Sequence, residues 1–410
     1  MSDKAVQQYL ERHAEPEAKQ GAWTGPPAEH VVCIPACRED GSLIQTLKSL
    51  SEVAEADQAL VVVVVNGGLL ADEAVHCSNR LCWQELERAA DLSPGPLAWG
   101  QLAGLRVLAV DRYSEGRRLP AKQGVGLARK IAGDIALRFV AEGRVRGGWM
   151  LCTDADVELP SNYLVRVREA KESNSALLYP FQHVPEGDVL QVEAMALYEA
   201  FLHYYVDGLR FAQSPYAFHT IGSLIGIRAS AYAAVRGFPK REAGEDFYLL
   251  NKLAKVGWVE QLTGDPIRIR GRVSSRVPFG TGAAVSKIRG LLAEGQPYRV
   301  MAPQVFQGLK VWINALEEFS AGGDIETLRF RLEQSSSVLL SVVEQSGALR
   351  AAEAAAAQVQ GAPLSRRLRE WNDAFRTLKL LHALRDGGAG EMALGDAQAL
   401  LRAMKGEGAA

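Results

Sequence analysis

Hydrophobic residues gather in short runs along the first part of the chain. The segments 30–36 (HVVCIPA), 59–66 (ALVVVVVN) and 105–111 (LRVLAVD) are apolar, rich in β-branched residues, and end at polar or glycine residues. Runs of this length predict strands, and runs that are apolar on both faces are typical of a sheet covered on both sides. A fourth strand is predicted over 147–156 (GGWMLCTDAD).

Segments with helical spacing separate these runs. Leucines recur at helical intervals in SLIQTLKSLSEV after the first run, and GLARKIAGDIALRFV (126–140) precedes the fourth. Strands that alternate with helices predict an α/β fold with a mostly parallel sheet and right-handed crossovers. Residues 1–28 are expected to form a polar helix and a loop, and 69–104 an insertion with one helix around CWQELERAA.

The pattern changes toward the C-terminus. Residues 188–212 predict a helix whose aromatic stripe packs in a core, SLIGIRASAYAAVRGF predicts a short strand and a helix, and GEDFYLLNKLAKVG predicts a helix. From about residue 285 a leucine- and alanine-rich helical pattern continues without strand runs, with Asp324 and Ser365 as expected helix N-caps. The expected domains are therefore 1–28, 29–284 and a helical region over 285–410.

Composition narrows the class of protein. The 410 residues exceed one typical domain of ~100 to 200 residues. With 48% hydrophobic residues, 23% charged residues and a net charge of -2, the chain resembles an ordinary soluble protein, and nothing global points to nucleic acid. Five cysteines without a CxxC pair argue against a disulfide framework or a zinc site and favour a cytoplasmic location. No stretch approaches the ~18 to 20 apolar residues of a spanning helix, and the charged N-terminus is no secretory signal.

Two aspartates, Asp154 and Asp156, follow the fourth apolar run in LCTDADVELP. Ligands of parallel sheets bind beyond the carboxyl ends of the strands, which is where these acids fall. Two like charges aimed at one point are costly unless a cation lies between them, and Mg²⁺ or Mn²⁺ prefers such oxygen ligands. By itself the pair also fits a solvated turn with a local cap.

Other motifs accompany the aspartates in a fixed order. They are IPACREDGSLIQTLKSL, LPAKQGVGLARKIAGDIA, CTDADVELPSNYL and GFPKREAGEDFYLLNKLAKVG. In this order, over about residues 29–280, the chain resembles the family 2 glycosyltransferases of the GT-A type. The resemblance implies a GT-A fold, a nucleotide-diphospho-sugar donor, and transfer of a sugar, expected to be a hexose, to the hydroxyl of an unknown acceptor.

The resemblance also implies which residues contact the donor. They are Pro35, Glu39, Asn66, Asp111, Lys122, Arg129, Asp154 and Arg276. Glu39 matches the acid of the P-x-x-N-E element, whereas Arg38 replaces its usual asparagine and Asn66 replaces the aspartate that the family offers to the base. These departures leave the nucleotide base open.

Basic residues near the donor have simpler interpretations as well. Lys122 and Arg129 are expected to face the diphosphate, although a solvated helix face would look similar. The alternating arginines of IRIRGRVSSR, among them Arg268 and Arg270, would share one face of a strand, which fits either an edge strand or a phosphate cradle. Arg276 is the candidate for a lid contact because glycines follow it.

The resemblance assigns the remaining chemistry to two acid pairs. Asp154 and Asp156 match the metal motif for Mg²⁺ or Mn²⁺, with Asp156 the more direct ligand. Because no histidine occurs between His219 and His382, we expect water or phosphate to complete the metal shell. In the Glu245-Asp246 element, Asp246 is the expected general base of an inverting transfer and Glu245 its neighbour or an acceptor contact. Acids in a first helical turn also simply favour the helix dipole.

Two other function classes stay open. One is nucleotidyl transfer on a related sheet, which usually brings a Gly-rich basic loop after the first strand, where this chain has CIPACREDGS. The other is a non-catalytic binder of nucleotide-sugars, which measurable turnover would exclude. The helical region could cover the acceptor site, mediate dimerisation, or make a peripheral membrane contact through SRRLREWNDAFRTLKLLHALR, and plain protein packing is the simplest role. The sugar, the acceptor, the choice between inversion and retention at the anomeric carbon, and the oligomeric state are not determined by the sequence.

Overall fold

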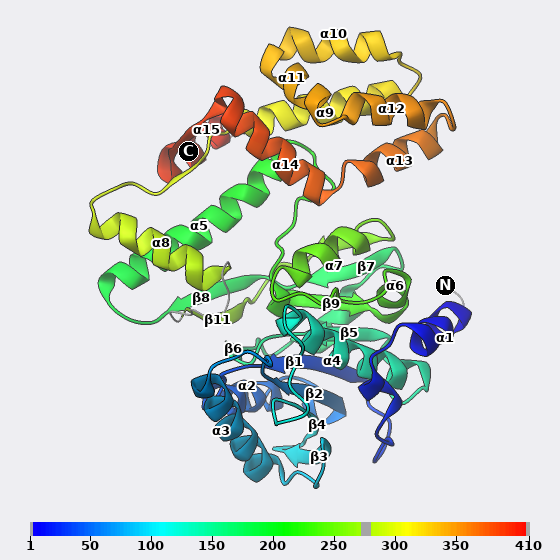
Figure 1. Cartoon of the computed structure of the whole chain (residues 1–410), viewed down its shortest axis with the longest axis vertical. Helices are drawn as coiled ribbons and strands as arrows, with labels where there is room; N and C mark the ends of the chain where they lie inside the picture. The colour runs from blue at the N-terminus through cyan, green and yellow to red at the C-terminus, as the bar shows by residue number, and fades with distance from the viewer. Residues whose placement is uncertain (1–2, 272–279, 407–410) are drawn as a thin grey trace. The chain divides into compact units, whose positions relative to one another are not determined.

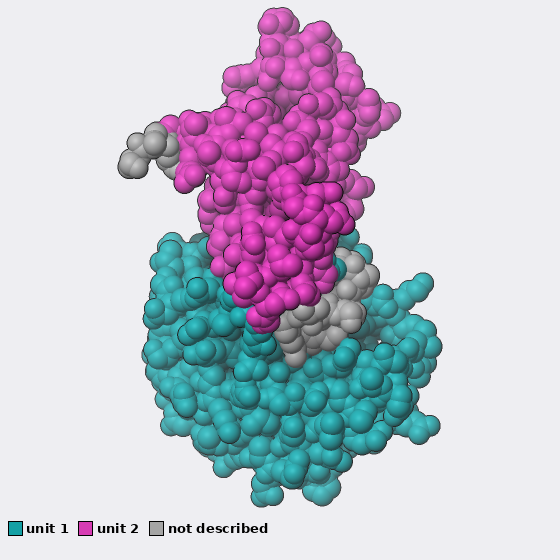
Figure 2. Space-filling view, turned by 90° about the vertical axis from the view of Figure 1, so that its left-hand side faces the viewer, with its two compact units in different colours: residues 1–186, 220–283 teal, residues 187–219, 284–410 magenta. Residues whose placement is uncertain are grey.

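The computed structural model describes residues 3–271 and 280–406. The chain forms two compact units, drawn in teal and magenta in Figure 2. Unit 1 comprises Met1–Glu186 and Thr220–Ala283, and unit 2 comprises Gly187–His219 and Ala284–Ala410. The predicted domain 29–284 includes residues 187–219, which belong to unit 2 in the structure. The domain boundaries at 28 and 284 stay a prediction.

Unit 1 is built on a mainly parallel sheet (Figure 1). The order of its strands is β10-β7-β9-β5-β1-β2-β4-β3, and β9 and β3 run antiparallel to the strands beside them. In chain order the strands are β1 (His30–Ala36), β2 (Ala59–Asn66), β3 (Leu97–Leu102), β4 (Leu105–Arg112), β5 (Trp149–Cys152), β7 (Asn174–Leu178), β9 (Ile225–Arg228) and β10 (Trp258–Gln261). All residues of β1 and β2 are buried, which their continuous apolar character requires.

Helices cover both faces of this sheet. They are α1 (Asp3–Arg12), α2 (Ser42–Ser51), α3 (Glu73–Ala90), α4 (Gly124–Ala141), α6 (Ala229–Ala234) and α7 (Glu245–Leu253). Helix α4 lies against β1 and β2 and packs with α1 and α6, whereas α2 packs with α3 (Figure 1). A Cβ at Gly126 would lie 2.4 Å from the carbonyl oxygen of Pro239, so only glycine allows this close approach of the loop before α7 to α4.

A second sheet of unit 1 follows the two aspartates. It has the order β6-β11-β8 and is formed by β6 (Val157–Glu158), β8 (Phe181–Pro185) and β11 (Ile267–Gly271). Because β11 is paired on both sides, the expectation that its alternating arginines mark an edge strand is wrong. Short 3₁₀ helices complete unit 1 at Pro16–Lys19, Ala56–Gln58, Val165–Glu169 and Gly222–Leu224.

Unit 2 is mainly helical. Its elements are α5 (Val189–Phe211), α9 (Gln304–Ser320), α10 (Ile325–Ser335), α11 (Ser337–Gln345), α12 (Ala348–Ala356), α13 (Ala362–Trp371), α14 (Ala374–Leu384), α15 (Leu394–Lys405), a π-helical turn at Arg385–Ala389, and the paired strands β12 (Arg299–Met301) and β13 (Glu391–Ala393). Helix α8 (Thr281–Ala293) begins just before the third point at which the chain passes from one unit to the other. As expected, the aromatic stripe of α5 packs into hydrophobic clusters. Within the described ranges, no helix combines the length and the apolar character needed to cross a membrane.

The predicted fold class is confirmed, with local differences. Strands β1 and β2 have the predicted bounds, and Asp324 caps α10 through the Thr327 N–H as expected. The predicted cap at Ser365 is wrong, since α13 begins after Gly361 and Ser365 lies inside it. The insertion 69–104 holds a strand, β3, besides its helix, because Leu97–Leu102 pairs antiparallel with β4 at the sheet edge.

Candidate active site

Asp154 and Asp156 lie just beyond the carboxyl end of β5, a central strand of the sheet. Strand β5 stops at Cys152, which pairs in register with Cys33 of β1. Asp154 and Asp156 follow in the turn that leads to β6. This turn lies at the carboxyl end of β5, the edge at which open α/β sheets bind their ligands.

Arg129 on α4 joins two of the predicted site acids. Its Nη2 donates to Oδ1 of Asp154 at 2.5 Å, and its Nε donates to Oε1 of Glu245 at 2.9 Å. Arg129 is 4% exposed, and a Cβ on Gly222 would lie 2.4 Å from Nη2, so the guanidinium is held against backbone. We call this group of Arg129, Asp154 and Glu245 the Arg129 bridge.

The Arg129 bridge brings together the segments predicted to lie on the donor side and on the acceptor side. Asp154 lies 25 residues and Glu245 116 residues from Arg129 along the chain. Burial by itself lowers the pKa of Arg129, but the carboxylates of Asp154 and Glu245 outweigh it and raise that pKa above its usual range. Arg129 is therefore a permanent cation between two acids, which is the arrangement that makes a buried charge tolerable.

Asp246 follows Glu245 of the bridge, and its carboxyl group has a raised pKa. Burial, and then the negative charge of Glu245, raise the pKa of Asp246 to about 7. The N–H of Phe247 donates to Oδ1 of Asp246 at 2.7 Å and opposes this rise. A carboxyl group that titrates near neutral pH can accept a proton from a substrate and release it again, as a general base must.

The start of α7 sets the direction of these two acids. Gly244 precedes the helix with a φ of 72°, a left-handed conformation that glycine adopts without strain. Glu245 then points toward Arg129 and is 4% exposed. An acid that served only the helix dipole would need neither the burial nor the ion pair, so the simple dipole interpretation does not account for Glu245.

The residues predicted to lie near the nucleotide base are at the ends of β1 and β2. Pro35 is buried within β1, and Glu39 and Asn66 are each 4% exposed. The side-chain amide of Asn66 donates to the carbonyls of Ala36 and Val64 at 3.1 and 3.2 Å. Asn66 thus fastens the two strand ends together, and a role in binding the base stays a prediction.

A residue that the sequence did not single out, Asn79 of α3, links the same strand ends. Its Oδ1 accepts the N–H of Arg38, and its Nδ2 donates to the carbonyl of Asn66. Asn79 is fully buried on the side of α3 that also buries Cys82 and Leu86. Its helical spacing from these two residues is the sequence signal that could have marked it as buried.

The other predicted donor contacts have varied surroundings. The Asp111 carboxylate accepts the N–H groups of Tyr113 and Ser114 and the Ser114 hydroxyl, and it pairs with Arg117, so it orders its own loop. Lys122 is exposed, with a φ of 65°, and makes no hydrogen bond or ion pair with the described residues. Arg276 lies outside the described residues.

The arginines of β11 line a polar hollow on unit 1. A cavity of about 320 Å³ lies between α2 and the second sheet and includes Arg268 and Arg270 among its lining. Each of these arginines has an acid nearby, Glu158 at 3.8 Å and Glu186 at 3.7 Å. Because the lining charges balance, the alternative interpretation of these arginines as a phosphate cradle gains no support from the hollow.

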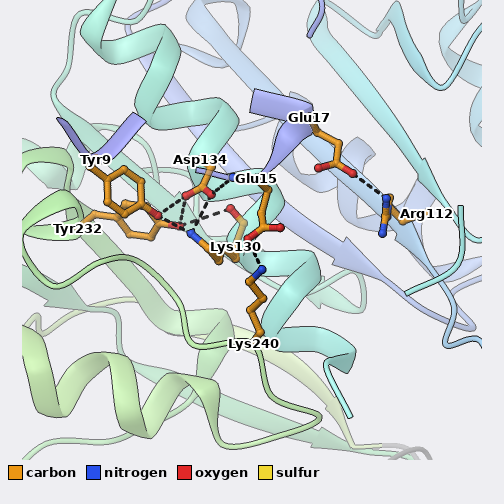
Figure 3. Close-up of polar contacts among 8 residues, drawn as sticks. All are labelled: Tyr9, Glu15, Glu17, Arg112, Lys130, Asp134, Tyr232 and Lys240. Carbon is orange, nitrogen blue, oxygen red and sulfur yellow. Dashed lines mark hydrogen bonds and ion pairs between the residues drawn. The ribbon is translucent and has the colours of Figure 1, made fainter. Parts of the chain in front are cut away.

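A second buried polar group includes Lys130, which directly follows Arg129 on α4, and Asp134 one turn further along the helix. Figure 3 shows this group. Asp134 is 0% exposed and accepts the hydroxyls of Tyr9 at 2.5 Å and Tyr232 at 2.9 Å, and the ammonium of Lys130 at 2.9 Å. We call Tyr9, Lys130, Asp134 and Tyr232 the Asp134 cluster. It fixes the N-terminal segment to α4 and α6, which the sequence analysis had not foreseen.

The same N-terminal segment reaches neighbours of the site (Figure 3). Glu15 pairs with Lys240 at 2.7 Å in the loop before α7, and Glu17 pairs with Arg112 at 2.8 Å beside Asp111. The one feature of the sequence that could have indicated the Asp134 cluster is the pair Lys130 and Asp134, two charges four residues apart within an apolar helix. Such a pair also fits a solvated helix face.

The donor types available suit a hard divalent cation. Asp154 and Asp156 offer carboxylate oxygens, and the Asp154 side chain remains 34% exposed beside Arg129. Mg²⁺ needs only one or two protein carboxylates when substrate phosphates and water complete its shell. Across residues 3–271 and 280–406, no group of three or more histidines, cysteines, aspartates or glutamates is placed to hold a metal ion.

Comparisons with known proteins give similarities of fold. No family model matches the chain, and no curated protein matches it. Residues 1–349 of S. aureus TarS in complex with UDP-GlcNAc are 13% identical, with 88% of this chain and 92% of that chain covered and a TM-score of 0.40. The mannosyltransferase PcManGT from Pyrobaculum calidifontis, in complex with GDP-Man and Mn²⁺, is 17% identical, with coverages of 93% and 94% and a TM-score of 0.38.

A third structure is matched over less of the chain. Glucosyl-3-phosphoglycerate synthase from Mycobacterium tuberculosis, in complex with Mn²⁺, UDP and glucosyl-3-phosphoglycerate, is 15% identical. The match covers 68% of this chain and 87% of that chain, with a TM-score of 0.33. The similarities to these solved structures extend over most of the chain and concern the fold, not the residues of the site.

Proposed function

We propose that the protein is a metal-dependent glycosyltransferase that moves a hexosyl group from a nucleotide-diphosphate donor to an acceptor hydroxyl. The observation that carries this proposal is the Arg129 bridge. It holds Asp154 of the metal motif and Glu245 of the acceptor-side motif on one buried cation, at the carboxyl end of β5. Motifs that are more than 90 residues apart in the sequence would thus serve one reaction centre.

Asp246 is the proposed general base. Its carboxylate would take the proton of the acceptor hydroxyl while that oxygen attacks the anomeric carbon of the donor sugar. The bond between the anomeric carbon and the diphosphate oxygen breaks, and the nucleoside diphosphate leaves with the electron pair. A pKa of about 7 supports this role, because it lets Asp246 be deprotonated near neutral pH yet basic enough to accept a proton.

Asp154 and Asp156 are the proposed ligands of Mg²⁺ or Mn²⁺. When bound, such an ion supplies Lewis-acid stabilisation of the charge that grows on the departing diphosphate. Arg129 would hold the Asp154 carboxylate in a fixed direction. The exposed cation of Lys122 would add a contact to the same phosphates.

Direct displacement by the acceptor oxygen implies inversion at the anomeric carbon. The proposal needs only one base on the acceptor side, and the Glu245-Asp246 pair provides it. Glu245 is engaged by Arg129 and would act on Asp246 through its charge, which helps to raise the pKa of Asp246. Glu245 is therefore proposed as a positioning residue.

Donor binding is the most direct test. Purified protein is heated with a panel of nucleoside diphosphates and nucleotide-sugars, with Mn²⁺ or with a chelator, beside an Asp156→Ala variant. A donor at a hundred times its Kd should stabilise the protein by about 2.7 kcal/mol. We expect this stabilisation for one base, only with metal, and not in the variant. Asp265→Ala is the matched control, because Asp265 is an exposed acid of the same unit.

Each result has a definite meaning. Metal-dependent stabilisation that Asp156→Ala abolishes and Asp265→Ala retains supports the donor site and names its base. Stabilisation that persists in Asp156→Ala, or that ignores the chelator, would contradict the metal role. Binding of a nucleotide-sugar without donor hydrolysis or transfer to any offered acceptor would favour the non-catalytic binder.

A further inference from the structure

We propose that helices α13 and α14 form a docking surface for anionic membrane lipids. Between Arg366 and Arg385 the chain has six cationic residues and two acidic ones, although the whole chain carries a net charge of -2. Positive charge is thus concentrated in one short part of unit 2. A cluster of Lys and Arg on an amphipathic helix attracts anionic lipids through its charge.

The cations lie on the outer side of these two helices. Leu364 and Leu368 of α13 are each 3% exposed and pack in the core of unit 2. The cationic side chains that are exposed are Arg366, Arg367, Arg369, Arg376 and Lys379. The apolar face of each helix is therefore used for folding, and the polar face is positive.

Acidic residues neutralise two of the six cations. Arg385 pairs with Asp386 at 2.8 Å and with Glu391 at 3.5 Å. Glu370 pairs with Arg366 at 2.8 Å, and the second acid, Asp373, is buried and caps α14. Arg367 and Arg369 donate to Gln358 and Ser365, which carry no charge. In the part of the chain that the structure describes, Arg367, Arg369, Arg376 and Lys379 have no acidic partner.

Aromatic rings lie among the cations. The guanidinium of Arg376 lies 4.3 Å from the ring centroid of Trp371, and the ammonium of Lys379 lies 4.6 Å from that of Phe375. Phe375 is 37% exposed. Aromatic rings beside cations suit the boundary between lipid headgroups and acyl chains, where the ring is partly buried and the cation meets phosphate. A surface for duplex DNA, which contacts mainly phosphates, would need the cations but gives no reason for an exposed phenylalanine.

Vesicle binding tests this proposal independently of the glycosyltransferase reaction. The full chain is sedimented with vesicles of phosphatidylcholine alone or with a third of phosphatidylglycerol, at low and at high salt. We expect binding only to the anionic vesicles and its loss at high salt. The triple variant Arg367→Gln, Arg369→Gln, Lys379→Gln should bind on the order of 100-fold more weakly, because each cation contributes to the attraction.

A matched variant removes the same charge elsewhere. Lys48, Arg144 and Arg146 are exposed cations of unit 1, and their replacement by glutamine should leave vesicle binding within about threefold of the parent. Circular dichroism and thermal unfolding must show that both variants are folded. The proposal is overturned if the parent ignores anionic vesicles, or if both triple variants lose binding equally. Tighter binding to DNA than to the vesicles would also overturn it and assign the surface to nucleic acid.

Discussion

Helix α4 contributes the adjacent residues Arg129 and Lys130 to two different ionic groups. The two groups differ in whether their carboxylates remain accessible to a ligand. In the Asp134 cluster, the carboxylate accepts four donors, including the Glu15 N–H at 2.8 Å, and is fully buried. In the Arg129 bridge, the Asp154 side chain is 34% exposed and Asp246 beside it titrates near 7. The first group is complete without a ligand, whereas the second retains acids that a ligand could meet.

The difference explains how similar chemistry can serve two purposes. A satisfied buried network fixes one arrangement of the chain, and here it fixes the N-terminal segment to α4. A network with exposed carboxylates and a perturbed pKa is typical of functional sites. Variants that separate stability from turnover can therefore test the comparison.

The largest expected effect is on turnover. Asp246→Asn removes the proposed base, so kcat should fall by on the order of 10²- to 10⁴-fold in a transfer or donor-hydrolysis assay. The same variant should unfold no more easily at pH 8. The raised pKa means that folding disfavours the ionised form of Asp246, so its stabilising contribution is lost as pH rises through about 7. Asp265→Asn is the control, and activity within threefold of the parent in Asp246→Asn would refute the base.

The next prediction compares the two cations directly. Arg129→Met and Lys130→Met each leave buried carboxylates without their cation, so each should lower the free energy of unfolding by about 3 to 5 kcal/mol. Denaturant unfolding measures this loss. At a temperature where both variants are folded, only Arg129→Met should also lower kcat/KM and metal-dependent donor binding. An equal loss of kcat/KM in Lys130→Met would mean that the two groups are not functionally distinct.

A smaller effect is expected at the N-terminal segment. Tyr9→Phe removes one hydroxyl from the Asp134 cluster and should cost about 1 to 3 kcal/mol of stability, because Asp134 is left with a weaker set of donors. Tyr113→Phe is the matched control, since the Tyr113 hydroxyl makes no hydrogen bond with the described residues. Thermal unfolding at one pH compares the two. Equal melting temperatures for both variants would show that Tyr9 does not stabilise the cluster.

The smallest predicted effect is on the pH profile. With a pKa of about 7, the deprotonated fraction of Asp246 falls roughly fivefold between pH 7 and pH 6, and kcat should fall with it. The rate therefore rises with pH and levels off above about 8. The residual activity of Asp246→Asn should lack this step. A step that persists unchanged in that variant would assign the titration to another group.

The sequence by itself determined the strands and the places of the acids. Runs such as ALVVVVVN leave little choice but a buried strand, because a polar surface could not tolerate them. The positions of Asp154 and Asp156 beyond β5, and of Glu245 and Asp246 at the start of α7, followed from these local patterns. Local spacing was sufficient there because each element is specified by neighbouring residues.

Only the tertiary structure decided which of these residues meet. Arg129 was expected to face a diphosphate, and the fold places it, almost without solvent exposure, between two acids from distant segments. The attachment of Tyr9 to Asp134 spans 125 residues and likewise has no local signature. An ion pair or hydrogen bond depends on distances of about 3 Å in space, and the sequence order of its partners does not constrain those distances until the sheet and its helices have packed.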